Sequence, residues 1–253
     1  MKKIGLVLVL FLVSSLGFAQ KYVVDVVIGD VVVRNKGKVK VVDVGDVLKV
    51  GDVLSTKEDS ECYISVEGKG YIKVEENSSV SFEEISKSFG SGTKDSLGVV
   101  GSVIFSVKGI FSKSKVLNVK SDTAFATIRG TEFVVESFRD KTTIYVLEGR
   151  VGVAPMFTKN ENTLIAKSII LSEGEKIEIS EIDVINATSF INNKDEEGYG
   201  VFLNGKKQSL IESEKERFAK RMEMLREIQK KRLKELEKKK KEYLKDPSKL
   251  FEE

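Results

Sequence analysis

The chain has 253 residues, of which 41% are hydrophobic and 32% charged, and its formal net charge is +3. It contains no histidine and one cysteine, which excludes Ser-His-Asp and Cys-His catalysis, imidazole zinc sites, intramolecular disulfides and cysteine-rich metal sites. The length and the hydrophobic fraction allow one or two domains with a real core. We therefore expect a binding protein with no catalytic residue, cofactor or metal.

The first nineteen residues have the composition of an export signal. Lys2 and Lys3 form a short basic start, an apolar run follows to Phe18, and small residues stand at Gly17 and Ala19. A retained membrane anchor is the alternative, but it needs about 20 apolar residues. We expect residues 1–19 to be a signal peptide cleaved near Ala19, which predicts a periplasmic or otherwise exported protein without a transmembrane segment in the mature chain.

Short, valine-rich strands dominate from residue 20 to residue 184. Glycine, asparagine and aspartate punctuate them at intervals of about 8–12 residues, and a Ser- and Gly-rich stretch, residues 84–98, reads as a surface loop. This pattern predicts an all-β domain, a jelly roll or β-sandwich, with a β-roll or solenoid as the alternative. The expected strands include Tyr22–Ile28, Asp30–Arg34, Val39–Val44, Gly70–Val74, Gly101–Val107, Val116–Lys120, Glu132–Glu136, Thr142–Leu147, Arg150–Val153 and Lys176–Ile179.

Cys62 is an unpaired cysteine in a chain expected to be exported. Such a thiol is either reactive or a small hydrophobic residue of the core. Cys62, Ile64 and Val66 alternate with polar neighbours, so we expect Cys62 on the inward face of a strand.

The chain after the β region divides into three parts. Residues 185–207 form a polar connection, with a short strand expected at Tyr199–Leu203. Residues 208–246 lack glycine and proline and predict a long charged helix, with Ser209 or Ser213 as its cap and Asp246-Pro247 as its end. Residues 247–253 form a tail.

The predicted helix is basic, whereas the β region is acidic. Residues 206–245 hold 16 Lys and Arg against 8 Asp and Glu. The apolar residues of the helix follow one loose stripe rather than a coiled-coil seam. The helix therefore docks partly on the β domain, pairs weakly with a second copy or a partner helix, or binds an anionic polymer or membrane surface. Export argues against nucleic acid as its target. The candidate interaction residues are Lys238, Lys239, Lys240 and Lys241.

Two sequence motifs together resemble one family. The first is Gly51-Asp-Val-Leu-Ser-Thr56, and the second pairs Ile128-Arg-Gly-Thr-Glu-Phe-Val134 with Glu148-Gly-Arg-Val151. In this order and separation they resemble the FecR domain, a periplasmic module named after the ferric-citrate signalling regulator. The resemblance extends from about Val24 to Ile179 and implies a jelly-roll-like all-β domain.

The residues that carry the resemblance have two interpretations. In the structural one, which we favour, glycines supply turn conformations, Asp52 accepts backbone N–H bonds, and Arg129 pairs with Glu148 across neighbouring strands. In the functional one, Arg129-Gly130-Thr131 is an anion or partner site. The motif residues are Gly51, Asp52, Thr56, Arg129, Gly130, Thr131, Phe133, Glu148 and Gly149.

The family's signalling regulators carry a cytoplasmic anti-sigma segment and a transmembrane helix, whereas here the domain directly follows the expected signal peptide. We therefore expect a stand-alone exported FecR-domain protein. The leading hypothesis is a non-enzymatic binding or scaffold protein that engages an envelope protein or polymer, with the basic helix for docking or assembly into a weak oligomer. One alternative is an accessory sensor in an envelope signalling or uptake system, acting through a partner membrane protein. The other is a glycan hydrolase that uses two carboxylates among Asp122, Glu132, Glu136 and Glu148.

Overall fold

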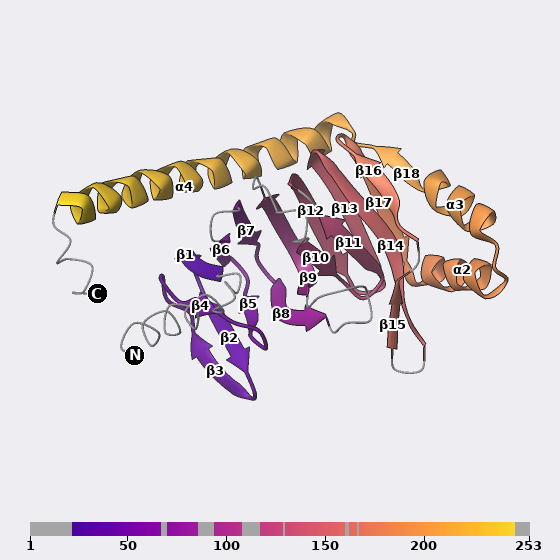
Figure 1. Cartoon of the computed structure of the whole chain (residues 1–253), viewed down its shortest axis with the longest axis horizontal. Helices are drawn as coiled ribbons and strands as arrows, with labels where there is room; N and C mark the ends of the chain where they lie inside the picture. Colours follow the sequence, from indigo (N-terminus) through magenta and orange to yellow (C-terminus); the bar gives the residue numbers. More distant parts are fainter. Residues whose placement is uncertain are drawn as a thin grey trace, which may run out of the picture.

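The structure is a computed structural model that describes residues 22–66, 70–85, 94–107, 117–128, 130–159, 162–165 and 167–245. Its body is built of β-strands, with two short helices at one end and one long helix across the top (Figure 1). The all-β prediction for the body is confirmed. The strand order does not single out a jelly roll.

One layer of strands, here called the helix-side sheet, is antiparallel at every pairing between the described residues. Its strands, in spatial order, are β4 (Val47–Leu48), β1 (Tyr22–Ile28), β6 (Glu61–Val66), β7 (Gly70–Val74), β9 (Lys94–Val107), β12 (Thr131–Phe138), β13 (Lys141–Glu148), β17 (Glu175–Ser180) and β18 (Lys207–Ser209).

The second layer, here called the far sheet, faces the first across the core. It is antiparallel except where β9 and β10 run parallel. Strand β15 (Asn162–Ile165) pairs with the end of β14. The strands of the far sheet, in spatial order, are β3 (Lys38–Val41), β2 (Val31–Asn35), β5 (Val53–Thr56), β8 (Ser79–Ile85), β9, β10 (Leu117–Lys120), β11 (Ala124–Ile128), β14 (Arg150–Lys159) and β16 (Ile169–Ser172).

Strand β9 belongs to both layers. Its residues 94–100 pair with β8 in the far sheet, and its residues 101–107 pair with β12 in the helix-side sheet. The strand changes layer at Gly101, whose φ is +90° and where an added Cβ would lie 2.3 Å from the Ser78 hydroxyl oxygen. Only glycine fits this bend without strain. The surface loop expected at residues 84–98 was predicted too long, because β8 and β9 take up both of its ends.

The main core lies between the two layers. Tyr22 packs edge-on against Phe82 of the opposite sheet, with ring centroids 4.9 Å apart. Cys62 is fully buried on β6 beside Ile64 and Val66, so the prediction that it faces the core is confirmed. A sandwich of this kind buries alternate residues of each strand.

Two helices fill the segment expected to be a polar connection. They are α2 (Glu181–Asn192) and α3 (Glu196–Gly205), and they lie together at one end of the body (Figure 1). The strand expected at Tyr199–Leu203 was wrong. Asp195 caps α3 by accepting from the Gly198 N–H, and Tyr199 and Leu203, four residues apart, enter the core from one helix face.

The long helix is α4 (Glu212–Lys245), which lies within the range predicted for it, residues 208–246. Its start differs from the prediction, because Ser209 lies in β18 and Ser213 lies inside the helix. The Glu214 carboxylate instead accepts a hydrogen bond from the Ile211 N–H at the helix start. Within the described part of the chain, no helix has the apolar length that a membrane span requires.

Candidate functional site

Helix α4 covers the outer face of the helix-side sheet (Figure 1). Phe218 and Met222 are buried there, and the Phe218 ring lies 4.8 Å from the Tyr145 ring. Strand residues of the helix-side sheet are therefore buried on both faces, one against the far sheet and the other against the helix. This second apolar cluster consists of Tyr63, Tyr71, Ile104, Val134, Tyr145, Leu210, Phe218, Met222 and Leu225.

Three arginines of α4 flank its apolar stripe and reach acidic residues of the sheet. At 100° per residue, Arg217 and Arg221 lie on one side of the stripe and Arg226 on the other. Their partners are all glutamates of the helix-side sheet or of the residue after β7. The pairs are Arg217 with Glu136 at 3.4 Å, Arg221 with Glu75 at 2.8 Å and Arg226 with Glu132 at 2.7 Å.

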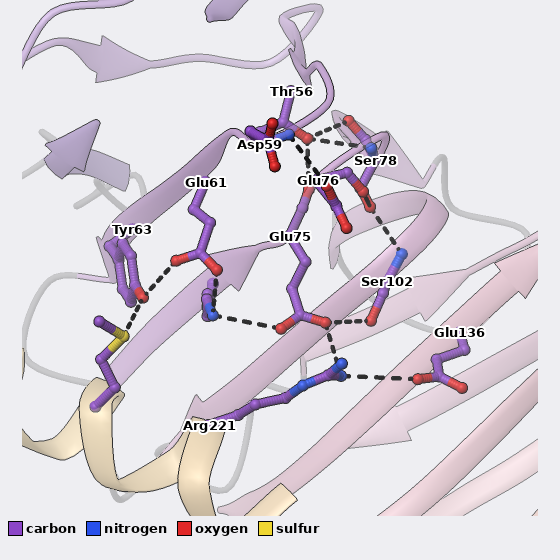
Figure 2. A network of polar contacts seen from close by, with 12 residues as sticks. Thr56, Asp59, Glu61, Tyr63, Glu75, Glu76, Ser78, Ser102, Glu136 and Arg221 are labelled. Atoms are coloured by element: carbon purple, nitrogen blue, oxygen red, sulfur yellow. Dashed lines mark hydrogen bonds and ion pairs between the residues drawn. The ribbon is translucent and has the colours of Figure 1, made fainter. Parts of the chain in front are cut away.

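The Arg221 contact belongs to a buried polar network, shown in Figure 2. Lys73 is 3% exposed, and its ammonium lies 2.7 Å from the Glu61 carboxylate and 3.3 Å from that of Glu75. Glu75 also accepts from the Ser102 hydroxyl at 2.7 Å. The buried lysine is thus compensated by two carboxylates, the condition under which a buried charge is tolerated.

Two tyrosines anchor the network to the helix. Burial raises the pKa of Tyr145 to about 12, and burial also raises the pKa of Tyr63 well above the ordinary value of a phenol. Both hydroxyls therefore stay protonated at neutral pH and donate to carboxylates, Tyr63 to Glu61 at 2.8 Å and Tyr145 to Glu136 at 3.0 Å. Together with the ion pairs, these hydrogen bonds hold α4 against the helix-side sheet.

A groove of about 740 Å³ opens beside the Arg226 contact, between α4 and the end of the β12–β13 pair. Glu132, Glu148 and Glu173 contribute its acidic groups, Lys215 and Arg226 contribute the basic ones, and the remainder of its wall is mostly apolar.

Residues of the second motif lie at this groove. Glu148 is opposite Glu132 in the strand register and lines the groove with it. Gly130 and Gly149 have φ of +65° and +86°, and a Cβ on Gly149 would lie 2.8 Å from the Thr131 methyl carbon. Thr131 and Phe133 are buried. The expected partner of Glu148, Arg129, lies outside the described residues.

The first motif lies elsewhere, in the β5 region of the far sheet. Gly51 has φ +92°, and the Asp52 carboxylate accepts from the Lys49 N–H at 2.7 Å. The Thr56 hydroxyl donates to the Glu75 carbonyl oxygen and its oxygen accepts from the Ser78 N–H. Gly51 and Asp52 thus lie in a turn that the Asp52 carboxylate closes, whereas Thr56 links β5 to the residues between β7 and β8.

The remaining predicted residues are dispersed. Lys238 is exposed on α4, and the side chains of Lys239, Lys240 and Lys241 lie outside those described. Asp122 is exposed in the turn after β10. Of the four carboxylates considered for hydrolysis, the structure brings Glu132 and Glu148 together. A search of the described residues finds no acidic, histidine or cysteine cluster with metal-binding geometry.

No local pattern in the sequence marks Lys73 and Glu75 as members of the buried network. Lys73 lies in the strand predicted at Gly70–Val74, whose pattern gives no sign of a buried ammonium, and Glu75 is the residue directly after that strand. The arginines carried a usable signal, because their positions on either side of the apolar stripe of α4 can be computed from helical spacing alone.

Fold and interface together define a two-layered β protein with a third layer made of one docked helix. Residues 52–152 match the family model described as FecR protein, which confirms the predicted resemblance over those residues. The match is less than half of the chain and begins within the first motif. Helices α2, α3 and α4, and hence the arginines of the interface, lie outside it.

Comparison with curated proteins finds no match. Two crystal structures described as "a putative anti-sigma factor" from Parabacteroides distasonis are similar, each with 14% identity and a TM-score of 0.38. The similarity covers 51% and 55% of this chain, and 55% and 63% of the two solved chains. The chain thus spans less than two thirds of the length of either.

Proposed function

We propose that the protein is an exported, non-enzymatic FecR-domain protein that binds an envelope protein or polymer. The observation that carries the proposal is the division of α4 into two halves. Its first half, to Ile228, packs on the helix-side sheet. In its second half, here called the distal segment (residues 229–245), every described side chain is exposed.

The distal segment is strongly basic. It holds nine Lys and Arg against three Asp and Glu, and Lys230, Lys231, Lys234 and Lys238 are exposed. A helix that only covered the sheet would need no such extension. A projecting basic rod attracts acidic surfaces and accelerates encounter with them.

The binding role is preferred to hydrolysis because of the state of Glu132. This carboxylate is 2% exposed, accepts from the Ser106 hydroxyl with one oxygen and pairs with Arg226 through the other. In both glycosidase mechanisms one carboxyl donates a proton and the other acts as base or nucleophile. The contacts of Glu132 instead favour a fixed carboxylate that holds the helix.

The test compares two charge-reversal variants of the purified protein in capture from envelope extracts. Lys234→Glu with Lys238→Glu reverses charge on the distal segment, and Lys220→Glu, also exposed but on the docked half, is the matched control. We expect the distal variant to lose a partner that the wild type and the control retain, and purified partner to bind directly with salt-dependent affinity. Identical partners for all three proteins would contradict the proposal, as would hydrolysis of envelope glycans by the wild type.

A further inference from the structure

A second surface lies at the end of the molecule formed by α2 and α3. A pocket of about 460 Å³ is lined there by three apolar residues, Phe190, Val201 and Phe202, and by two acidic ones, Asp195 and Glu197. The two phenylalanine rings lie 5.6 Å apart, and Val201 is 69% exposed. None of the residues that line this pocket is basic.

The helices around the pocket are acidic as a whole. Residues 181–205 hold five Asp and Glu and one Lys. Two further isoleucines, Ile182 and Ile185, are exposed on α2, so the apolar character continues beyond the pocket. An apolar surface that also carries acidic groups is complementary to a basic helix that also carries apolar residues.

The distal segment of α4 has that composition. Besides its nine basic residues it contains Leu233, Leu236, Tyr243 and Leu244. The two surfaces cannot meet within one chain, because α4 begins beside α3 and runs straight across the sheet to the opposite end (Figure 1). Its 34 residues span about 51 Å at 1.5 Å per residue.

We propose that the distal segment of one copy docks on the α2–α3 pocket of a second copy, in a head-to-tail contact. The inference rests on the proposed function for the binding role of the distal segment, and it adds a second copy of this chain as a partner of that segment. Each copy then carries one donor surface and one acceptor surface. Such a heterologous contact generates a ring if the rotation between copies closes and an open filament if it does not.

The acidic groups of the pocket argue for a second copy over an anionic polymer. A polymer would pair with the basic side chains of the distal segment but would leave Asp195 and Glu197 of the pocket without a role. A second copy pairs the basic distal segment with the acidic groups of the pocket. Every copy of the protein supplies one distal segment and one pocket, so the two surfaces are always present in equal numbers.

The experiment measures molar mass by light scattering and sedimentation at low and high salt. Acceptor-blocked protein carries Glu197→Lys and Val201→Lys, and donor-blocked protein carries Lys234→Glu and Lys238→Glu; all four positions are exposed. We expect the wild type to associate with increasing concentration. Each blocked variant is expected to associate about tenfold more weakly or more, because each charge reversal replaces an attraction across the contact by a repulsion. Circular dichroism checks that the variants remain folded.

Mixing the two blocked variants gives the decisive readout. Acceptor-blocked protein retains an intact donor and donor-blocked protein an intact acceptor, so a one-to-one dimer that grows no further is expected. Combining Glu197→Lys with Lys238→Glu in one chain restores opposite charges across the contact and is expected to restore association. A monomeric wild type at low salt, or blocked variants that associate like the wild type, would overturn the head-to-tail contact. Neither outcome would change the result of the capture experiment with envelope extracts, which tests the proposed function separately.

Discussion

Phe218→Ala tests whether the first half of α4 is a structural layer of the domain. Phe218 is 1% exposed and is one of the largest side chains buried between the helix and the helix-side sheet. Its ring contacts Tyr145, and the Arg217 guanidinium lies 4.4 Å from its centroid. Truncation therefore removes apolar burial, an aromatic pair and a cation–π contact together.

Phe218→Ala is expected to lower the free energy of unfolding by about 3–5 kcal/mol, the range found when a buried phenylalanine of a core is replaced by alanine. The aromatic pair contributes roughly 0.5–1.5 kcal/mol of this and the cation–π contact about 0.5–1 kcal/mol. For a chain of this size, a loss of 1 kcal/mol lowers Tm by about 2–4 °C. The variant is thus expected to melt roughly 6–20 °C below the wild type.

Two measurements separate loss of the whole fold from release of the helix. Urea denaturation gives the global free energy of unfolding, and amide hydrogen exchange reports on residues 212–228 directly. Lys220→Ala, an exposed site on the same helix, is the matched control and is expected to change stability by less than about 0.5 kcal/mol. If Phe218→Ala melted with the wild type and left exchange in the helix unchanged, the helix would not be held by this cluster.

Other predictions concern single side chains. Burial alone would raise the pKa of Asp183, but hydrogen bonds, chiefly from Lys206, outweigh it and hold that pKa below the ordinary value. A lowered folded-state pKa adds stability above the unfolded pKa of about 3.8 and loses it as the pH falls through the folded value. Asp183→Asn is therefore expected to destabilise by about 1 kcal/mol at pH 7, and its deficit in thermal melts is expected to shrink as the pH falls below 3.8, whereas a deficit that does not change with pH would refute the charge argument. Burial raises the pKa of Cys62 to about 12, so iodoacetamide at pH 8 is expected to modify the unfolded chain only, and rapid labelling of native protein would contradict its buried position. Gly101→Ala places a Cβ against Ser78 at a φ of +90° and is expected to cost more than about 2 kcal/mol in urea denaturation, a cost that a flexible bend would not show.

Period-two patterning predicted most strands because each strand of the sandwich has an inward face. The strand predicted at Tyr22–Ile28 coincides with β1 and that at Gly70–Val74 with β7. The pattern failed at Tyr199–Leu203, where the aromatic and branched residues favour a strand by propensity. The cap at Asp195 and the four-residue spacing of Tyr199 and Leu203 determine a helix instead. Short segments of this kind are decided by capping and tertiary contact rather than by propensity.

The site was less predictable than the fold because it is made by contacts distant in sequence. Glu75 and Arg221 are 146 residues apart, and neither carries a local signal for the other. Lys73 follows the apolar Ile72 in β7, and a single sequence gives no indication that both faces of that strand are covered. The second motif likewise carries no local sign that Glu148 lines the groove beside α4.

The charge split of the chain acquires a structural meaning from the two halves of α4. In the docked half, Arg217, Arg221 and Arg226 pair with Glu136, Glu75 and Glu132, which are largely buried beneath the helix. The distal segment has no such partner among the described residues within its own chain, although it is the more basic of the two. Ion pairs with the sheet thus account for the arginines of the first half of the helix, whereas the charge of the distal segment is the observation on which its proposed binding role rests.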